Sequence, residues 1–176
     1  MIKGWAARWT VAAGVASLGI AAPAHATPQD WDRASSIVRT GIVAFSIGLP
    51  AGKGDWSGLK QNALAVGATG GITGGLKRVS HEQRPDGSDD RSFPSGHTSI
   101  SFAAAAGLEK RYGWKLGLPA HMAAAFVGIA RVKAKKHYLH DVLIGAAIGE
   151  AAGLILVRKR RPNRNAPIIA GFSIAF

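Results

Sequence analysis

Apolar residues in this chain gather in segments whose lengths suit helices better than strands. After residue 26, five such segments are each bounded by glycine, proline or charge: Ala34–Leu49, Leu59–Leu76, Gly96–Leu108, Leu116–Val132 and Leu139–Val157. Strands are usually shorter than these runs. The pattern therefore predicts an all-α fold, a helical bundle of five core helices, or six if a further N-terminal segment is retained. Thr27 or Asp30 is expected to cap the first helix, and Ser57 the second.

The N-terminus has the layout of a secretory signal peptide. Lys3 and Arg8 precede an apolar stretch, and Ala24-His25-Ala26 has the form of a cleavage site. We predict a signal peptide over residues 1–26, a helical domain over 27–160 and a basic, apolar tail over 161–176. The alternative is a retained first transmembrane helix, although its apolar part is shorter than the ~20 residues that a bilayer requires. Both alternatives direct the chain out of the cytoplasm.

The distribution of charge bears on whether the helices cross a membrane. If the N-terminal segment and all five others cross, one side receives Lys3, Arg8, Lys53, Lys60, Lys110, Arg111, Lys115 and the residues 158–161. This distribution obeys the positive-inside rule and places the polar loop 77–97 and the turn 131–138 on the opposite, periplasmic side. An exported soluble or peripheral bundle with basic loops is the alternative, and the sequence leaves both open.

Composition narrows the kind of partner. The chain has 22 Lys and Arg against 10 Asp and Glu, a net charge of +12, which favours an anionic partner. A hydrophobic fraction of 47% excludes a disordered basic protein, and the absence of cysteine excludes disulfides and thiolate chemistry. The 23 glycines, with many alanines, predict helices that pack closely through small residues.

Three clusters of residues carry candidate chemistry. In the last of them, Arg131 is followed by His137 and Asp141. The spacing of His137 and Asp141 is i, i+4, which predicts that they share one helix face. A carboxylate there fixes the tautomer of the imidazole and frees its other nitrogen to act. A structural His–Asp pair that only stabilises a turn is the alternative.

The two earlier clusters supply cations and the start of a helix. Lys77 and Arg84 can bind phosphoryl oxygens, Arg84 through its planar fork. Ser95 is a good N-cap, Gly96 allows close backbone approach, and the first amides of a helix attract anions. His97 lies in that first turn, where it could protonate a leaving group. Together with Arg131, these parts suit phosphoryl transfer without any metal or cofactor.

The order and spacing of these clusters resemble the type-2 phosphatidic acid phosphatase and vanadium haloperoxidase superfamily. Its signature reads K-x6-R-P, then P-S-G-H, then S-R-x5-H-x3-D, and the sole fixed position that differs here is Ala130 before Arg131. The resemblance implies an acid-phosphatase-like or haloperoxidase-like helical fold. It implies His137 as a nucleophile that forms phosphohistidine, Asp141 as its orienting group and His97 as the general acid. The implied phosphate ligands are Lys77, Arg84, Ser95, Gly96 and Arg131.

These observations predict a phosphatase in the bacterial envelope with its site on the periplasmic side. The expected substrate is a phosphomonoester or diphosphate, of a lipid above all, with membrane contact and no nucleic-acid partner. The alternatives are a vanadate-dependent haloperoxidase and a non-catalytic envelope protein that binds anionic lipid. Which lipid is bound, and the oligomeric state, do not follow from the sequence.

Overall fold

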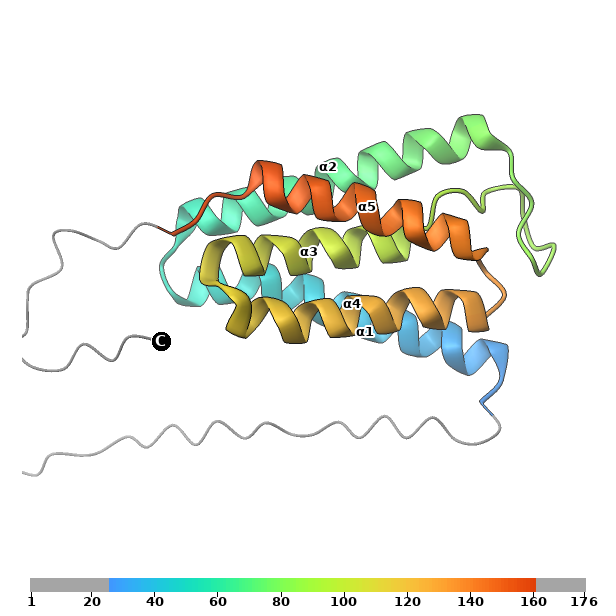
Figure 1. Cartoon of the computed structure of the whole chain (residues 1–176), viewed down its shortest axis with the longest axis horizontal. Coiled ribbons are helices and arrows are strands. Elements are labelled where there is room, and N and C mark those ends of the chain that lie inside the picture. Colours follow the sequence, from blue (N-terminus) through green and yellow to red (C-terminus); the bar gives the residue numbers. More distant parts are fainter. Residues whose placement is uncertain (1–25, 161–176) are drawn as a thin grey trace, which may run out of the picture.

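The computed structural model describes residues 26–160, which form five helices without a strand (Figure 1). The helices are α1 (Pro28–Gly52), α2 (Trp56–Ser80), α3 (Gly96–Tyr112), α4 (Trp114–Lys133) and α5 (Leu139–Leu156). The predicted all-α bundle of five core helices is confirmed. The predicted signal peptide, apart from Ala26, and the tail from residue 161 lie outside the described residues.

Local chemistry explains where the helices begin. The Thr27 side chain accepts from the Asp30 amide, and Asp30 bonds back to the Thr27 backbone, so both predicted capping residues act together. The prediction of Ser57 as the second cap is wrong, because Asp55 occupies that position and accepts from the Gly58 amide. A carboxylate two residues earlier serves the same orphan donors and also suits the positive end of the helix dipole.

The bundle is arranged around α3, which packs against all four other helices. Its closest neighbour is α5, where Gly145, Gly149 and Gly153 follow each other at i, i+4 spacing. A Cβ atom built on Gly145 would lie 2.6 Å from the carbonyl oxygen of Ser95, and one on Gly149 would collide with that of Ser99. The predicted close packing through small residues is therefore confirmed at this interface.

Many of the buried side chains are small and polar, and many of the large apolar side chains are exposed. Buried hydroxyl and amide side chains include those of Ser35, Ser46, Asn62, Thr69, Thr73, Thr98, Ser99 and Ser101. Several satisfy themselves on the preceding helical turn, as Thr69 does on the Ala65 carbonyl. Large apolar side chains are exposed on α1, α2, α4 and α5, among them Phe45, Leu64, Met122, Leu143 and Ile155.

Two of the five helices, α1 and α5, are long and apolar enough to cross a bilayer by length and composition. Of their most apolar windows, 22% and 28% are buried within the bundle.

The connections fall at opposite ends of the bundle. One end holds the start of α1, the long loop after α2 and the α4–α5 turn, and the other holds the α1–α2 turn, the α3–α4 turn and the end of α5 (Figure 1). At the second end Arg111 bonds Asp55 and donates to the Arg158 carbonyl at 2.9 Å. The two groups of loops that the charge pattern separated are thus at different ends.

Candidate active site

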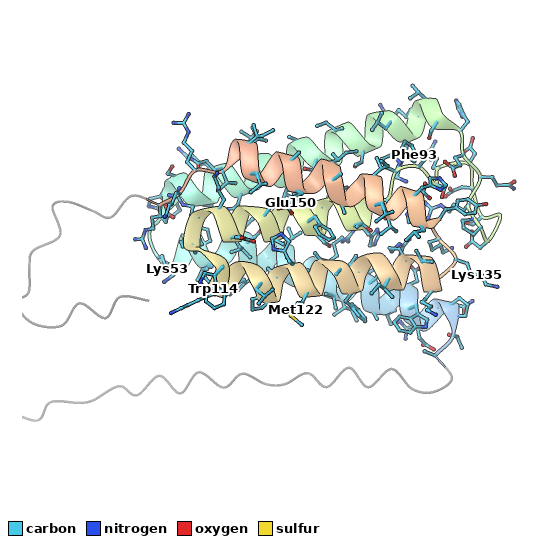
Figure 2. The ribbon with its side chains drawn as sticks, in the orientation of Figure 1. Lys53, Phe93, Trp114, Met122, Lys135 and Glu150 are labelled. Atoms are coloured by element: carbon cyan, nitrogen blue, oxygen red, sulfur yellow. The ribbon has the colours of Figure 1, made fainter. Side chains whose placement is uncertain are left out.

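The three sequence clusters meet at the end of the bundle that Phe93 and Lys135 mark in Figure 2. Lys77 lies in the last turn of α2, Arg84 in the loop that follows, and Gly96 and His97 in the first turn of α3. Arg131 lies in the last turn of α4, His137 in the α4–α5 turn and Asp141 in the first turn of α5. Residues up to 64 positions apart therefore converge because α2 and α4 end, and α3 and α5 begin, at this end of the bundle.

Specific hydrogen bonds fasten the clusters to one another. The Ser95 amide donates to the Asp141 carbonyl at 3.0 Å, which joins the start of α3 to the start of α5. The Lys77 ammonium donates to the carbonyls of Arg91 at 2.6 Å and Ser92 at 2.9 Å, which joins α2 to the loop before α3. These backbone contacts fix the relative positions of all three parts.

His137 and Asp141 are buried together at the centre of this group. Their side chains are 2% and 0% exposed, and His137 Nδ1 lies 3.4 Å from Asp141 Oδ2. The prediction that both share one helix face is wrong, because α5 begins only at Leu139 and His137 precedes it. The pairing arises instead because the Asp141 carboxylate also accepts from the Tyr138 amide at 2.9 Å and caps the helix.

The environment of His137 keeps its imidazole neutral. Burial lowers the pKa of His137 to about 2, and the positive charges of Lys77, Arg131 and Arg84 act in the same direction. A neutral ring has an unprotonated nitrogen available for attack. With Nδ1 turned toward Asp141, that nitrogen is Nε2.

Ser92 is a site residue that sequence reasoning missed. Its hydroxyl is buried and donates to Asp141 Oδ2 at 2.5 Å. Ser92 follows a run of polar loop residues and has no helical spacing to Asp141, so nothing in the local pattern distinguishes it from other loop serines. The Ser92 amide donates to the Glu82 carbonyl at 2.8 Å. This hydrogen bond folds the long loop back on itself and holds Ser92 beside Asp141.

A second histidine contacts the other oxygen of Asp141. His140 Nε2 lies 3.2 Å from Asp141 Oδ1 and 2.8 Å from Glu82 Oε1, and its ring stacks on Tyr138. The ligand atoms of Glu82, His140 and Asp141 lie within 4.8 Å of one another, a spacing that a metal ion could bridge. The contact between His140 and Glu82 is a hydrogen bond, whereas Asp141 Oδ1 has no hydrogen-bond partner within the described residues.

The cations of the site each have an acidic or carbonyl partner. Arg84 donates to Asp89 at 2.6 Å, Arg131 pairs with Asp32 of α1, and Lys136 donates to Asp86 at 2.6 Å. Although partial desolvation acts the other way, the hydrogen bond from Lys136 holds the pKa of Asp86 below its ordinary value. These pairs hold the cations in place around His137.

The remaining predicted residues open α3. Ser95 occupies the N-cap position, but its buried hydroxyl lies 2.9 Å from that of Thr98 instead of bonding a helix amide. Gly96 lies beside Lys77, and His97 Nε2 lies 3.1 Å from the Ser36 hydroxyl of α1. The roles of Ser95 and Gly96 as phosphate ligands therefore stay predictions. The groups that would bind phosphate are the Ser95 hydroxyl and the backbone amides at the start of α3.

This chain is thus an all-helical protein whose bundle brings cationic side chains and histidines together at one end. A family model described as the PAP2 superfamily matches residues 59–165. The chain belongs to the PAP2 superfamily, which confirms the resemblance seen in the sequence.

Individual relatives agree with this assignment. The chain is 36% identical over 98 residues to a lipid A 1-phosphatase of Porphyromonas gingivalis, covering 54% of this chain and 22% of that protein. It is 32% identical over 121 residues to a lipid A 4'-phosphatase of Helicobacter pylori, covering 62% and 61%. The chain thus spans from about a fifth to three fifths of the length of these two relatives.

A solved structure supports the fold. The crystal structure of Aquifex aeolicus LpxE superposes with a TM-score of 0.59 and 23% sequence identity, covering 73% of this chain and 83% of that one. The likeness concerns the arrangement of the helices.

Proposed function

We propose that this chain is a metal-independent phosphatase that hydrolyses a lipid phosphomonoester or diphosphate through a phosphohistidine at His137. The observation that carries the proposal is the buried, neutral His137 beside Asp141, with Lys77, Arg84 and Arg131 acting on the same ring. A neutral nucleophile among three fixed cations is what attack on a phosphoryl anion requires. The names of the two relatives, a lipid A 1-phosphatase and a lipid A 4'-phosphatase, favour a lipid substrate.

The proposed reaction has two displacements. In the first, His137 Nε2 attacks phosphorus, the bond to the leaving oxygen breaks, and protonated His97 gives that oxygen its proton. Burial and the charge of Arg131 lower the pKa of His97 to about 3, so this step requires the negative charge of the phosphoryl group to hold a proton on His97 when the substrate binds. In the second, water attacks phosphorus, the P–N bond breaks, and His97 takes the proton from water, which restores both histidines. Lys77, Arg84 and Arg131 neutralise the charge on the equatorial oxygens in both steps, and the N-terminal amides of α3 add to them. Asp141 stabilises the charge that develops on the His137 ring.

We also propose that the bundle lies in a bilayer with this site at its periplasmic surface. The outward apolar side chains of α1, α2, α4 and α5 support integration, and the basic residues near the opposite end support the orientation. Carbonate extraction of membranes, with N-terminal sequencing of the mature chain, tests this part. Retention in the extracted membrane is expected, whereas release into the soluble fraction would favour the peripheral alternative.

The catalytic proposal is tested by phosphate release from a panel of lipid phosphates. We expect release by the native protein and almost none by His137→Asn. The matched control is His81→Asn, because His81 is exposed outside the cluster and its backbone φ of 46° suits asparagine. Undiminished release by His137→Asn would overturn the mechanism, and lipid binding without release would favour the non-catalytic alternative.

A further inference from the structure

Helix α1 contributes no residue to the three-part signature, and the family match begins after it, at residue 59. Its first turns nevertheless contact the site. Asp32, Ser35 and Ser36 follow i, i+3, i+4 spacing, so they lie on one face of α1. Asp32 and Ser35 bond Arg131, and Ser36 contacts His97. One helix face thus touches both the buried arginine and the histidine that we assign as the general acid.

The contact with Arg131 fixes one side of its guanidinium. Nη1 donates to Asp32 Oδ1 and, at 3.3 Å, to Ser35 Oγ. Arg131 is 3% exposed, and its Nε has no hydrogen-bond partner within residues 26–160. A buried guanidinium is stable only when a counter-ion compensates for its desolvation, and Asp32 supplies that charge. With Nη1 occupied, the buried Nε–H is left with a hydrogen-bonding capacity that an oxygen of the substrate would satisfy.

The contact with His97 limits the orientation of its ring. Ser36 Oγ lies 3.1 Å from His97 Nε2, and this pair links residues 61 positions apart in the chain. His97 is the second residue of α3, where the helix starts beside Lys77 and Gly96. A hydroxyl on Nε2 selects one ring orientation and one tautomer at a time.

We propose that this face of α1 positions two groups of the active site. Asp32 orients Arg131 for the phosphoryl group, and Ser36 orients His97 for the leaving oxygen. The inference rests on the proposed phosphatase function and extends it to residues outside the signature. Asp32 and Ser36 act through Arg131 and His97, and neither is assigned a contact with the reacting atoms.

A different role for Asp32 predicts the opposite effect on anion binding. An acid beside a phosphate site could simply compete with the substrate for Arg131, in which case its removal would strengthen anion binding. A positioning role predicts the reverse, because a guanidinium without its counter-ion no longer holds its geometry.

Binding of orthovanadate by isothermal titration separates these two roles and needs no turnover. We expect Asp32→Asn to weaken binding about tenfold, the size of one charge-assisted hydrogen bond, and Asp32→Glu to recover part of the loss. The matched control is Asp90→Asn, since Asp90 is exposed and pairs only with the exposed His81 among the described contacts. Equal or tighter binding by Asp32→Asn than by Asp90→Asn would overturn the role of Asp32.

The leaving-group dependence of the rate tests Ser36. General acid help matters most for a poor leaving group such as the alcohol of a lipid phosphate, and least for p-nitrophenolate. We expect Ser36→Ala to lower kcat on the lipid phosphate about tenfold and on p-nitrophenyl phosphate much less. Ser36→Thr should restore the rate, and Ser57→Ala, an exposed serine at the other end of the bundle, should leave both rates unchanged.

The outcomes distinguish this inference from the function on which it rests. Equal loss on both substrates, or no loss, in Ser36→Ala would overturn the role of Ser36 while the native protein still hydrolyses the lipid. If the native protein released no phosphate from any lipid, the proposed function and the Ser36 role would both fall. The vanadate titration would then still decide whether Asp32 positions Arg131.

Discussion

The Ser92 hydroxyl lies 2.5 Å from the Asp141 carboxylate, and both side chains are fully buried. Asp141 Oδ2 accepts hydrogen bonds from the Ser92 hydroxyl and the Tyr138 amide, and His137 Nδ1 lies 3.4 Å from it. Three neighbours around one oxygen fix the carboxylate in a single orientation. Since Asp141 is the group that orients His137 in our proposal, Ser92 acts on the nucleophile through it.

Ser92→Ala is expected to lower both activity and stability. A hydrogen bond to a charged group is worth about 1.5–3 kcal/mol, so we expect a loss of about 2 kcal/mol in the free energy of unfolding. We expect kcat on a lipid phosphate to fall about tenfold at the same time, because the carboxylate is no longer held against His137. Phosphate release and thermal unfolding in detergent measure the two effects. Ser92→Thr keeps the hydroxyl and should retain most of both, and an unchanged kcat in Ser92→Ala would contradict the role.

Gly149→Ala is expected to destabilise the bundle without any contact to the site. The added Cβ would collide with the Ser99 carbonyl oxygen, and backbone cannot yield as a flexible side chain can. Overpacking of this kind costs about 1–3 kcal/mol, which thermal unfolding would report as a lower Tm. The matched control is Gly71→Ala on α2, where no atom lies within 4 Å of the new Cβ. That variant should be neutral or more stable, since alanine favours the helix by about 1 kcal/mol. Equal Tm values for the two variants would contradict the close α3–α5 packing.

The ion pair at the opposite end makes stability depend on pH. The hydrogen bonds from Arg111 lower the pKa of Asp55 below its ordinary value of 3.8, although burial acts the other way. Because the folded pKa is depressed, this contribution is complete above pH 3.8 and is lost as the pH falls through the lower folded value. We expect Asp55→Ala to lose about 3 kcal/mol at neutral pH, as for a broken buried pair. The difference from the native protein should shrink under acid conditions.

Unfolding curves of the native protein and Asp55→Ala, recorded from neutral to acid pH, check this expectation. Asp90→Ala is the exposed control and should change stability by less than about 1 kcal/mol at any pH. A difference between Asp55→Ala and the native protein that stays constant down to the lowest pH would show that the charge of Asp55 is not what stabilises this end.

Much of this molecule follows from its sequence, and the exceptions have physical causes. The segment lengths predicted five helices because apolar run length is a local signal. Local spacing did not predict that Lys77, Arg84, His97, Arg131 and His137 lie together; the resemblance of their three motifs to a superfamily signature, with their shared chemistry, indicated it. Helix ends were less predictable: α2 begins at Trp56 because Asp55, rather than Ser57, satisfies its first amides.

Residues that act through space were missed for a different reason. Ser92 lies 49 positions from Asp141, and Asp32 lies 99 positions from Arg131. Neither distance corresponds to a helical or strand period, so only the packing of the loop and of α1 brings these groups together. The pairing of His137 with Asp141 was expected for the wrong reason, since a helix-capping carboxylate, and not a shared helix face, places them together.

The central claim is that His137 carries the phosphoryl group during turnover, and trapping that intermediate tests it most directly. The native protein would be mixed with a ³²P-labelled lipid phosphate, quenched in alkali within a turnover, digested, and its labelled peptide identified by mass spectrometry. The account predicts an acid-labile, alkali-stable label on His137 that is absent from His137→Asn and present in His81→Asn. Label on any other residue, or phosphate release by the native protein with no labelled protein at any quench time, would contradict it.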